Sequence, residues 1–135
     1  MQNTDIYLPL SYIGFGGHGY QERDILHVDD LNEFVYAQIL KFKTIFNVTL
    51  SAGGGKKNLI SLKKLTNLCQ KITGNKTKIS SISKTSIFDI PYFCTSNEVS
   101  KKLYNWSPKK NLDDIAEDIL RWQKKEFKNL KKYFK

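Results

Sequence analysis

Apolar side chains recur three or four positions apart in three stretches, which is the spacing of one face of an α-helix. The first stretch follows Asp30 and ends near Lys41, and the second runs from Leu62 to about Thr73. The third begins after Asn111. We therefore expect three amphipathic helices. Their expected buried faces are, in chain order, Leu31, Phe34, Val35, Gln38 and Ile39; Leu62, Leu65, Leu68, Cys69 and Ile72; and Leu112, Ile115, Ala116, Ile119, Trp122, Phe127 and Leu130.

Residues with the chemistry of helix caps mark where these helices begin and end. The expected N-caps are Asp30, Ser61, Thr95 and Asn111, and the expected C-terminal stop is Gly74. Glu33 and Glu98 follow two of these caps at the spacing of a capping box. The second box predicts a further short helix that ends near Tyr104.

Short extended or β-branched runs between the helices predict strands. The expected strands are Tyr7–Ile13, interrupted by Pro9, then Asp24–Val28, Ile45–Leu50 and Lys78–Ile82. The run IFNVTL at 45–50 is β-branched and aromatic, and we expect it to be buried within a larger sheet. The alternation of strands and helices indicates an α/β fold whose few strands form an incomplete sheet. We expect a single domain over 1–135, with a Lys-rich helical tail at 124–135.

Composition limits the class of protein. A chain of 135 residues with 40% hydrophobic and 13% aromatic residues can form one domain with a core. It contains neither an apolar run of about 18 residues nor a signal-peptide pattern at its start, so we expect a cytoplasmic location. Cys69 and Cys94 are expected to be buried, reduced thiols. His18 and His27 are the only histidines, and no motif predicts a metal site.

The net charge of +9 has more than one interpretation, because many lysines lie at 124–135. The tail could bind nucleic acid, or it could be a solvated helix face. It contains almost no Arg, the residue that best contacts bases and phosphates, so we favour the solvated face. An anionic ligand or an acidic partner would also suit the charge.

Two glycine clusters have the appearance of phosphate-binding loops. Gly14, Gly16 and Gly19 match G-x-G-x-x-G, but a strand-like run follows them where a dinucleotide site requires a helix. We expect a tight turn that brings Gln21 and Arg23 to a ligand.

The second cluster, at 53–55, lacks the Gly-Lys-Ser/Thr ending of a P-loop. Lys56 and Lys57 either meet phosphates there or form a solvated turn. Arg23 is the best ligand candidate because a guanidinium can clamp a diphosphate; the alternative is a structural pair with Asp24 or Glu22.

Three blocks carry a resemblance to a known family. They are YIGFGGHGYQERDILHVDDL at 12–31, GGGKKNLISLKKLTNLCQKITGN at 53–75, and DIPYFCTSNEVSKKLYNWSPKKNLDDIAEDILRW at 89–122. In this order they resemble the C-terminal, sugar-nucleotide-binding portion of extended short-chain dehydrogenases/reductases (SDR, Rossmann-type), the NAD-dependent epimerase/dehydratase family. The first block is most similar to the branch of CDP-paratose (CDP-tyvelose) 2-epimerases.

The resemblance implies roles for particular residues. Arg23 would contact the nucleotide diphosphate with Gln21 beside it, whereas Asp24, His27 and Asp29 would be structural. The family's second phosphate-binding Arg is absent from the segment 85–89, where only Lys84 is close.

The resemblance also implies what this chain lacks. The family's NAD-binding half and its catalytic Tyr-x-x-x-Lys lie upstream of the matching region, and no tyrosine here has a Lys four positions later. We therefore expect a truncated or split substrate-binding part of a nucleotide-sugar epimerase, with no catalytic residue, no bound NAD and no activity alone. Its expected partners are a CDP- or UDP-linked sugar, and a separate Rossmann-half chain or a second copy. The alternatives are a non-catalytic nucleotide-sugar-binding module and a small basic nucleic-acid-binding protein.

Overall fold

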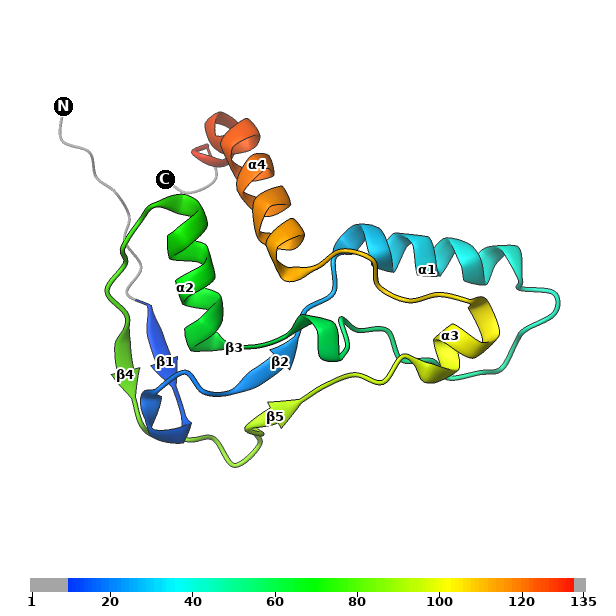
Figure 1. The fold of residues 1–135 in the computed structure, drawn as a ribbon, viewed down its shortest axis with the longest axis horizontal. Coiled ribbons are helices and arrows are strands. Elements are labelled where there is room, and N and C mark those ends of the chain that lie inside the picture. The colour runs from blue at the N-terminus through cyan, green and yellow to red at the C-terminus, as the bar shows by residue number, and fades with distance from the viewer. Residues whose placement is uncertain (1–9, 133–135) are drawn as a thin grey trace.

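The computed structural model describes residues 10–132 (Figure 1). Its strands are β1 (Ser11–Ile13), β2 (Glu22–Asp24), β3 (Leu59–Ser61), β4 (Ser80–Ile82) and β5 (Tyr92–Phe93). Its helices are α1 (Val28–Leu40), α2 (Leu62–Thr73), α3 (Glu98–Tyr104) and α4 (Leu112–Leu130), with short 3-10 turns at Phe15–Gly17 and Lys56–Asn58. The predicted α/β class is confirmed.

The strands form two small sheets. β2 is the central strand of the order β3-β2-β5, antiparallel to β3 and parallel to β5, and β1 pairs in parallel with β4. Figure 1 shows both sheets towards one end of the molecule, with α2 standing beside β4 there, α1 and α3 at the other end, and α4 rising from the middle. Since the neighbours of β2 come from distant parts of the chain, this strand fixes the position of several loops.

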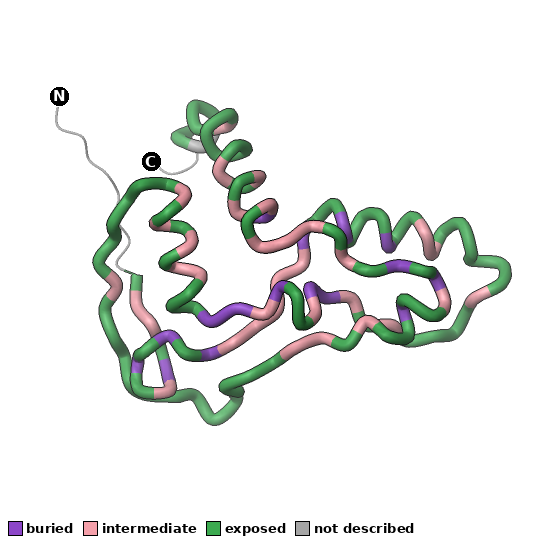
Figure 2. Tube along the Cα trace, viewed as in Figure 1, coloured by how far each residue is buried: buried purple, intermediate pink, exposed green. Residues whose placement is uncertain are grey.

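The core lies between α1 and α3. Phe34 stacks on Trp106 with ring centroids 4.4 Å apart, and it meets Tyr104 edge-on at 5.6 Å. The indole nitrogen of Trp106 donates to the carbonyl of Asp30 at 3.0 Å. Most of the remaining chain is exposed or half-buried (Figure 2), so one aromatic cluster supplies much of the described core.

The strand and cap predicted around Asp24–Asp30 are wrong. The strand is Glu22–Asp24, and α1 already begins at Val28 because the Nδ1 atom of His27 accepts from the amide of Asp29. Asp30 is 2% exposed. Its carboxylate accepts the amides of Lys109 and Lys110, each at 3.1 Å, instead of capping its own helix.

The predicted strand at Ile45–Leu50 is also wrong for this structure, where the segment is a loop. Within residues 10–132, no amide from Phe46 to Leu50 donates a hydrogen bond. A strand needs a neighbour to pair with, and the described part of the chain supplies none here. By contrast, β1 and β4 confirm a strand within each of the segments expected at 7–13 and 78–82, but Leu10, Lys78 and Ile79 are not part of them, and residues 7–9 lie outside the described residues.

The other caps divide into right and wrong predictions. Ser61, Gly74 and Asn111 cap as expected, and Asn111 forms a capping box with Asp114. Thr95 does not cap α3, whose N-cap is Asn97, because the Thr95 hydroxyl donates to Asp24. Each misplaced cap therefore has its polar side chain committed to a distant segment.

The expected buried faces are mostly uncovered. Of the described residues on the expected faces, only Phe34 of α1 and Ile115 of α4 are buried, and α2 has no buried residue. Cys69 is exposed and Cys94 half-buried, so the prediction of two buried thiols is wrong. The side chain of Leu130 and residues 133–135 lie outside the description. The apolar faces are present, but the described chain contains too little material to cover them.

Candidate functional site

The first glycine cluster forms an irregular loop that leads into β2. Gly14, Gly16, Gly17 and Gly19 all have positive φ, which glycine adopts without the steric cost that a Cβ imposes. The loop contains the 3-10 turn Phe15–Gly17 and is followed by β2, and no α-helix begins in it. The loop therefore lacks the helix N-terminus that holds a pyrophosphate in a dinucleotide site, and these residues do not fit NAD.

Arg23 lies on β2, with its side chain 37% exposed. Its Nη2 atom donates to Asp89 Oδ1 at 3.0 Å and to the carbonyl of Ile90 at 2.6 Å. Its Nη1 atom donates to the main-chain carbonyl of Glu22 at 2.8 Å. The pairing with the carboxylate of Asp24 or Glu22 that we considered is thus replaced by a pair with Asp89. A guanidinium has five N–H donors, so donors remain for an anionic ligand.

Gln21 lies beneath the glycine loop. It is 5% exposed, and its Nε2 atom donates to the carbonyl of Ile13. Its Oε1 atom has no hydrogen-bond donor among the described residues. A Cβ on Gly14 would lie 3.5 Å from both Gln21 Nε2 and Asp89 Oδ2, so these residues meet around one point. The ligand contact expected of Gln21 stays a prediction.

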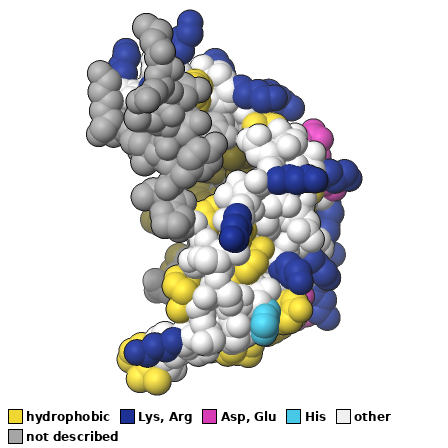
Figure 3. Space-filling model, turned by 90° about the vertical axis from the view of Figure 1, so that its left-hand side faces the viewer, with side chains coloured by type: hydrophobic (Ala, Val, Ile, Leu, Met, Phe, Trp, Pro, Cys, Tyr) yellow, Lys and Arg dark blue, Asp and Glu magenta, His cyan; other side chains and the backbone are white. Residues whose placement is uncertain are grey.

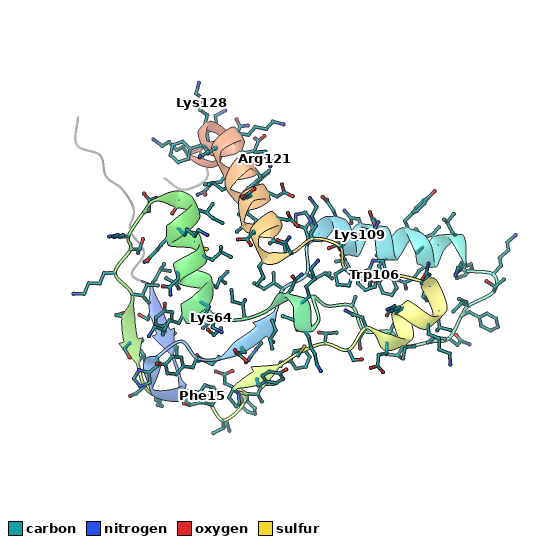
Figure 4. All side chains as sticks on the ribbon, in the orientation of Figure 1. Phe15, Lys64, Trp106, Lys109, Arg121 and Lys128 are labelled. Carbon is teal, nitrogen blue, oxygen red and sulfur yellow. The ribbon has the colours of Figure 1, made fainter. Side chains whose placement is uncertain are left out.

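Lys84 is exposed in the loop between β4 and β5. The next residue, Thr85, accepts the amide of Phe15 through its hydroxyl at 2.7 Å, which fixes the start of this loop beside the glycine loop. Asp89 fixes its other end to Arg23. Figure 4 shows Phe15 at this turn. We call the area formed by residues 14–19, Arg23 and the loop 83–90 the Arg23 surface.

Asp24 has the structural role that we expected of it. Its carboxylate accepts the amide and hydroxyl of Thr95, each at 3.2 Å, and the amide of Gly55 at 2.8 Å. A Cβ on Gly54 would collide with the carbonyl of Ile25, so this glycine permits a close approach of two main chains. The second glycine cluster is thus part of the scaffold under β2, and Lys57 contacts the carbonyl of Lys109.

A second charged cluster surrounds Asp118 on α4. Lys110 Nζ lies 2.7 Å and Arg121 Nη1 3.1 Å from its carboxylate oxygens, and Nε2 of the buried His27 lies 3.5 Å away. The hydrogen bond from Lys110 lowers the pKa of Asp118, and the same bond raises the pKa of Lys110. Because His27 caps α1 as well, this cluster joins the starts of α1 and α4, in keeping with the structural role expected of His27.

Sequence reasoning missed Asp89, Asn97 and Asn58. Asn97 holds Gly53 through both its amide atoms, and the fully buried Asn58 donates to the carbonyl of Lys110 at 2.9 Å. The available signal was the Asp-x-Pro motif for Asp89 and the Ser-Asn helix start for Asn97. Within the described residues, no group of three His, Cys, Asp or Glu side chains could hold a metal ion. Likewise, none of the described helices combines the length and apolar character needed to span a bilayer.

Comparison with known proteins agrees with this architecture. No family model matches the chain. A UDP-glucuronate 4-epimerase of Thermodesulfobacterium geofontis is 25% identical over 115 residues, which are 85% of this chain and 34% of that protein. The chain thus spans about a third of the length of this relative.

Solved structures extend the comparison. A UDP-glucose-4-epimerase from Stenotrophomonas maltophila with bound NAD and formylated UDP-arabinopyranose matches with a TM-score of 0.72 and 18% identity, over 87% of this chain and 36% of that one. The epimerase Mth375 of Methanothermobacter thermautotrophicus matches with a TM-score of 0.77 and 16% identity, over 88% and 34%. The fold is that of the C-terminal portion of extended SDR epimerases and dehydratases.

Proposed function

We propose that this chain is the nucleotide-sugar-binding portion of an NAD-dependent nucleotide-sugar epimerase, with a CDP-linked sugar as its ligand. The observation that carries the proposal is Arg23, a half-exposed guanidinium on the central strand beside an exposed loop. The likeness in fold to UDP-sugar epimerases supports the class of ligand. The CDP linkage rests on the YIGFGGHGYQERD block alone.

In this proposal Arg23 binds the diphosphate in place of the Asp89 carboxylate. A diphosphate offers several anionic oxygens in a geometry that suits a guanidinium, and Asp89 already shows where such an oxygen can lie. Lys84 would add a second positive charge from the loop. Gln21 would keep the glycine loop in place through its bond to Ile13.

Catalysis would require residues that this chain does not carry. Proton transfer in this class of reaction uses a tyrosine whose pKa is lowered by a lysine four positions later, and that pair is missing from the sequence. NAD supplies the hydride chemistry in the complete enzyme, and in the proposal it is held by a separate chain with the dinucleotide-binding fold. A non-catalytic binding module, without such a partner, is the alternative that the same missing pair favours. A cytoplasmic location stays a prediction from the sequence.

Thermal melts of the purified chain with CDP, UDP, NAD or a short DNA duplex test the proposal. We expect CDP to raise the melting temperature and NAD and DNA to leave it unchanged. Arg23→Gln should weaken CDP binding by about 1.5–3 kcal/mol, the usual contribution of a hydrogen bond to a charged group. Asp89→Asn should strengthen binding, because it removes the carboxylate that competes for Arg23 while the carbonyl of Ile90 still holds the loop to Arg23.

Arg121→Gln is the matched control, since it removes the same charge from an exposed side chain on α4. It should leave the response to CDP unchanged. If Arg23→Gln and Arg121→Gln weaken CDP binding equally, the effect is one of overall charge, and the proposed site is contradicted. If DNA instead raises the melting temperature more than CDP does, and that rise is lost when residues 124–135 are deleted and falls steeply with salt concentration, the result supports the nucleic-acid-binding alternative.

A further inference from the structure

The helices α2 and α4 enclose an apolar groove that the Arg23 surface does not use. Its volume is about 370 Å³, and its walls are almost entirely apolar. The lining includes Leu65, Cys69 and Ile72 from α2 and Ile115, Ile119 and Leu120 from α4. Ile119 is 57% exposed, and Cys69 is also exposed. A hollow of this kind between two helices suits the apolar side chains of a third.

Further apolar side chains are exposed on the second half of α4, beyond the lining of the groove. Phe127 is 50% exposed, and Trp122 is 56% exposed but lines a separate hollow beside His27 and Asp29 at the start of α1. In Figure 1 this half of α4 rises away from the sheets, beside the C-terminal end of α2. An occupant would therefore meet several turns of apolar surface.

The two helices that form the groove are rich in basic residues. α2 has no acidic residue and carries Lys64 and Lys71, while the Nζ atom of its third lysine, Lys63, lies 5.4 Å from the centre of the Tyr20 ring. The stretch 121–132 contains a single acid, Glu126. Its bases are Arg121, Lys124, Lys125, Lys128, Lys131 and Lys132. Figure 3 shows Lys and Arg side chains on the part of the molecule that is not covered in grey, seen from the side of β4 and α2, with hydrophobic side chains exposed between them and few acidic ones.

The acids of the first half of α4 do not offset this charge. Asp114 accepts the amide of Asn111 in the capping box, and Asp113 lies in the same first turn, where negative charge stabilises a helix. Asp118 is bound by Lys110 and Arg121, which leaves Glu117 as the one acid beyond the first turn of this half without a partner among the described residues. The rim at the C-terminal ends of both helices therefore stays basic.

We propose that the groove between α2 and α4 binds an amphipathic helix with acidic flanks, contributed by a partner protein. Apolar side chains at positions i, i+3, i+4 and i+7 would enter the groove, while Glu or Asp residues would meet the lysines of the rim. A second copy of this chain would bring lysines against lysines, and like charges oppose such contacts. A nucleic acid would meet the lysines but leave the apolar walls unused. The inference goes beyond the proposed function and does not depend on nucleotide binding.

Cys69 provides a direct readout, because it lines the groove and is exposed. In a Cys94→Ser background, the rate at which Ellman's reagent modifies Cys69 reports access to the groove. The probe is a helical peptide with Leu at the i, i+3, i+4 and i+7 positions and Glu elsewhere. Its controls are a scrambled peptide of the same composition and a peptide with Lys in place of each Glu.

We expect the acidic peptide to slow modification of Cys69 about tenfold at a concentration about ten times its dissociation constant, by mass action. The two control peptides should leave the rate unchanged. Ile119→Glu should abolish the protection, since it places a charge in the groove at a side chain that is already exposed. Asn67→Glu adds the same charge at an exposed position of α2 outside the lining and should retain the protection.

Three results would overturn the proposal. They are no protection by the acidic peptide, equal protection by a control peptide, and protection that rises with the concentration of the chain alone while sedimentation shows a dimer. The last result would identify a second copy as the occupant. Because no nucleotide is present, failure here leaves the test of Arg23 with CDP untouched.

Discussion

Carboxylates hold distant segments of this protein together. Asp24 joins β2 to the second glycine cluster and to Thr95, and Asp30 joins α1 to the segment before α4. The 2% exposed Asp30 is tolerated because two amides donate to its oxygens, which offsets part of its lost hydration. Asp89 joins the loop that carries Lys84 to Arg23 on β2. At the scale of single residues, acidic side chains therefore position the loops of the candidate site.

Asp118 gives a pH prediction at this scale. Its pKa is lowered by the hydrogen bond from Lys110, so the ionised form adds stability above the ordinary value of 3.8. That stability should be lost as the pH falls through the lowered pKa. Melts from pH 7 into the acid range should show a steeper fall for the native chain than for Asp118→Asn.

The matched control for this experiment is Glu117→Gln. Glu117 is exposed and forms no hydrogen bond or ion pair with the described residues, so its substitution should keep the native pH profile. Lys110 gives the opposite pH dependence because its pKa is raised. Its contribution to stability is present below pH 10.5 and is lost as the pH rises through the raised pKa. Identical acid profiles for Asp118→Asn and the native chain would refute this role of the pair.

Local capping decides where the helices begin, and partners decide where strands form. The best-defined start is that of α4, where Asn111 accepts the amide of Asp114 at 3.0 Å and Asp114 accepts the amide of Asn111 at 2.8 Å. Both bonds join residues three positions apart, so this signal is visible in the sequence. Strands such as β5, with two residues, depend on β2 and have no comparable local signal.

Asn111→Ala should therefore destabilise the chain. Loss of an N-cap side chain costs about 1 kcal/mol of the free energy of unfolding, which denaturant titration followed by circular dichroism can measure. Asn67→Ala, at an exposed position inside α2, is the control and should be neutral or slightly stabilising because Ala favours helix. If the two variants have equal stability, the capping box contributes nothing measurable to α4.

The molecule as a whole exposes more apolar surface than its core encloses. Leu31, Val35 and Ile39 of α1 are 40%, 47% and 65% exposed, although their spacing marks them as one face. The loop at Ile45–Leu50 follows directly, with Phe46 67% exposed. Together these features support a fold completed by further polypeptide, in agreement with the third of a relative's length that the chain spans.

Hydrogen exchange tests this view of the whole molecule. The amides of Phe46–Leu50 have no acceptor within residues 10–132, so we expect them to exchange fast in the chain alone. On mixing with a chain that carries the dinucleotide-binding portion of this fold, they should become protected as the segment pairs with its sheet. Amides within α1, such as that of Leu31 bonded to His27, should be protected in both states and serve as the control. Complex formation without protection at 46–50 would argue against strand pairing.

Much of the candidate site could be predicted from sequence, but its partners could not. Arg23 stood out because a charged residue followed a glycine-rich loop, and the structure places it on the central strand. Its pairing with Asp89 joins residues 66 positions apart, and no local pattern encodes such a contact. The same holds for Gln21, whose burial follows from the path of the glycine loop above it.

The sequence by itself determined the α/β class, the extent of α2, the start of α4 and several of their caps, because these features depend on periodicity and on bonds between near neighbours. Tertiary structure alone decided the place of Asp30 and Thr95, the pairing of the short strands and the exposure of the apolar faces. Each of these depends on which distant segment competes for a polar group or covers an apolar one. The segment Ile45–Leu50 shows the difference, since its β-branched sequence favours a strand and only a neighbouring strand can provide the hydrogen bonds to form one.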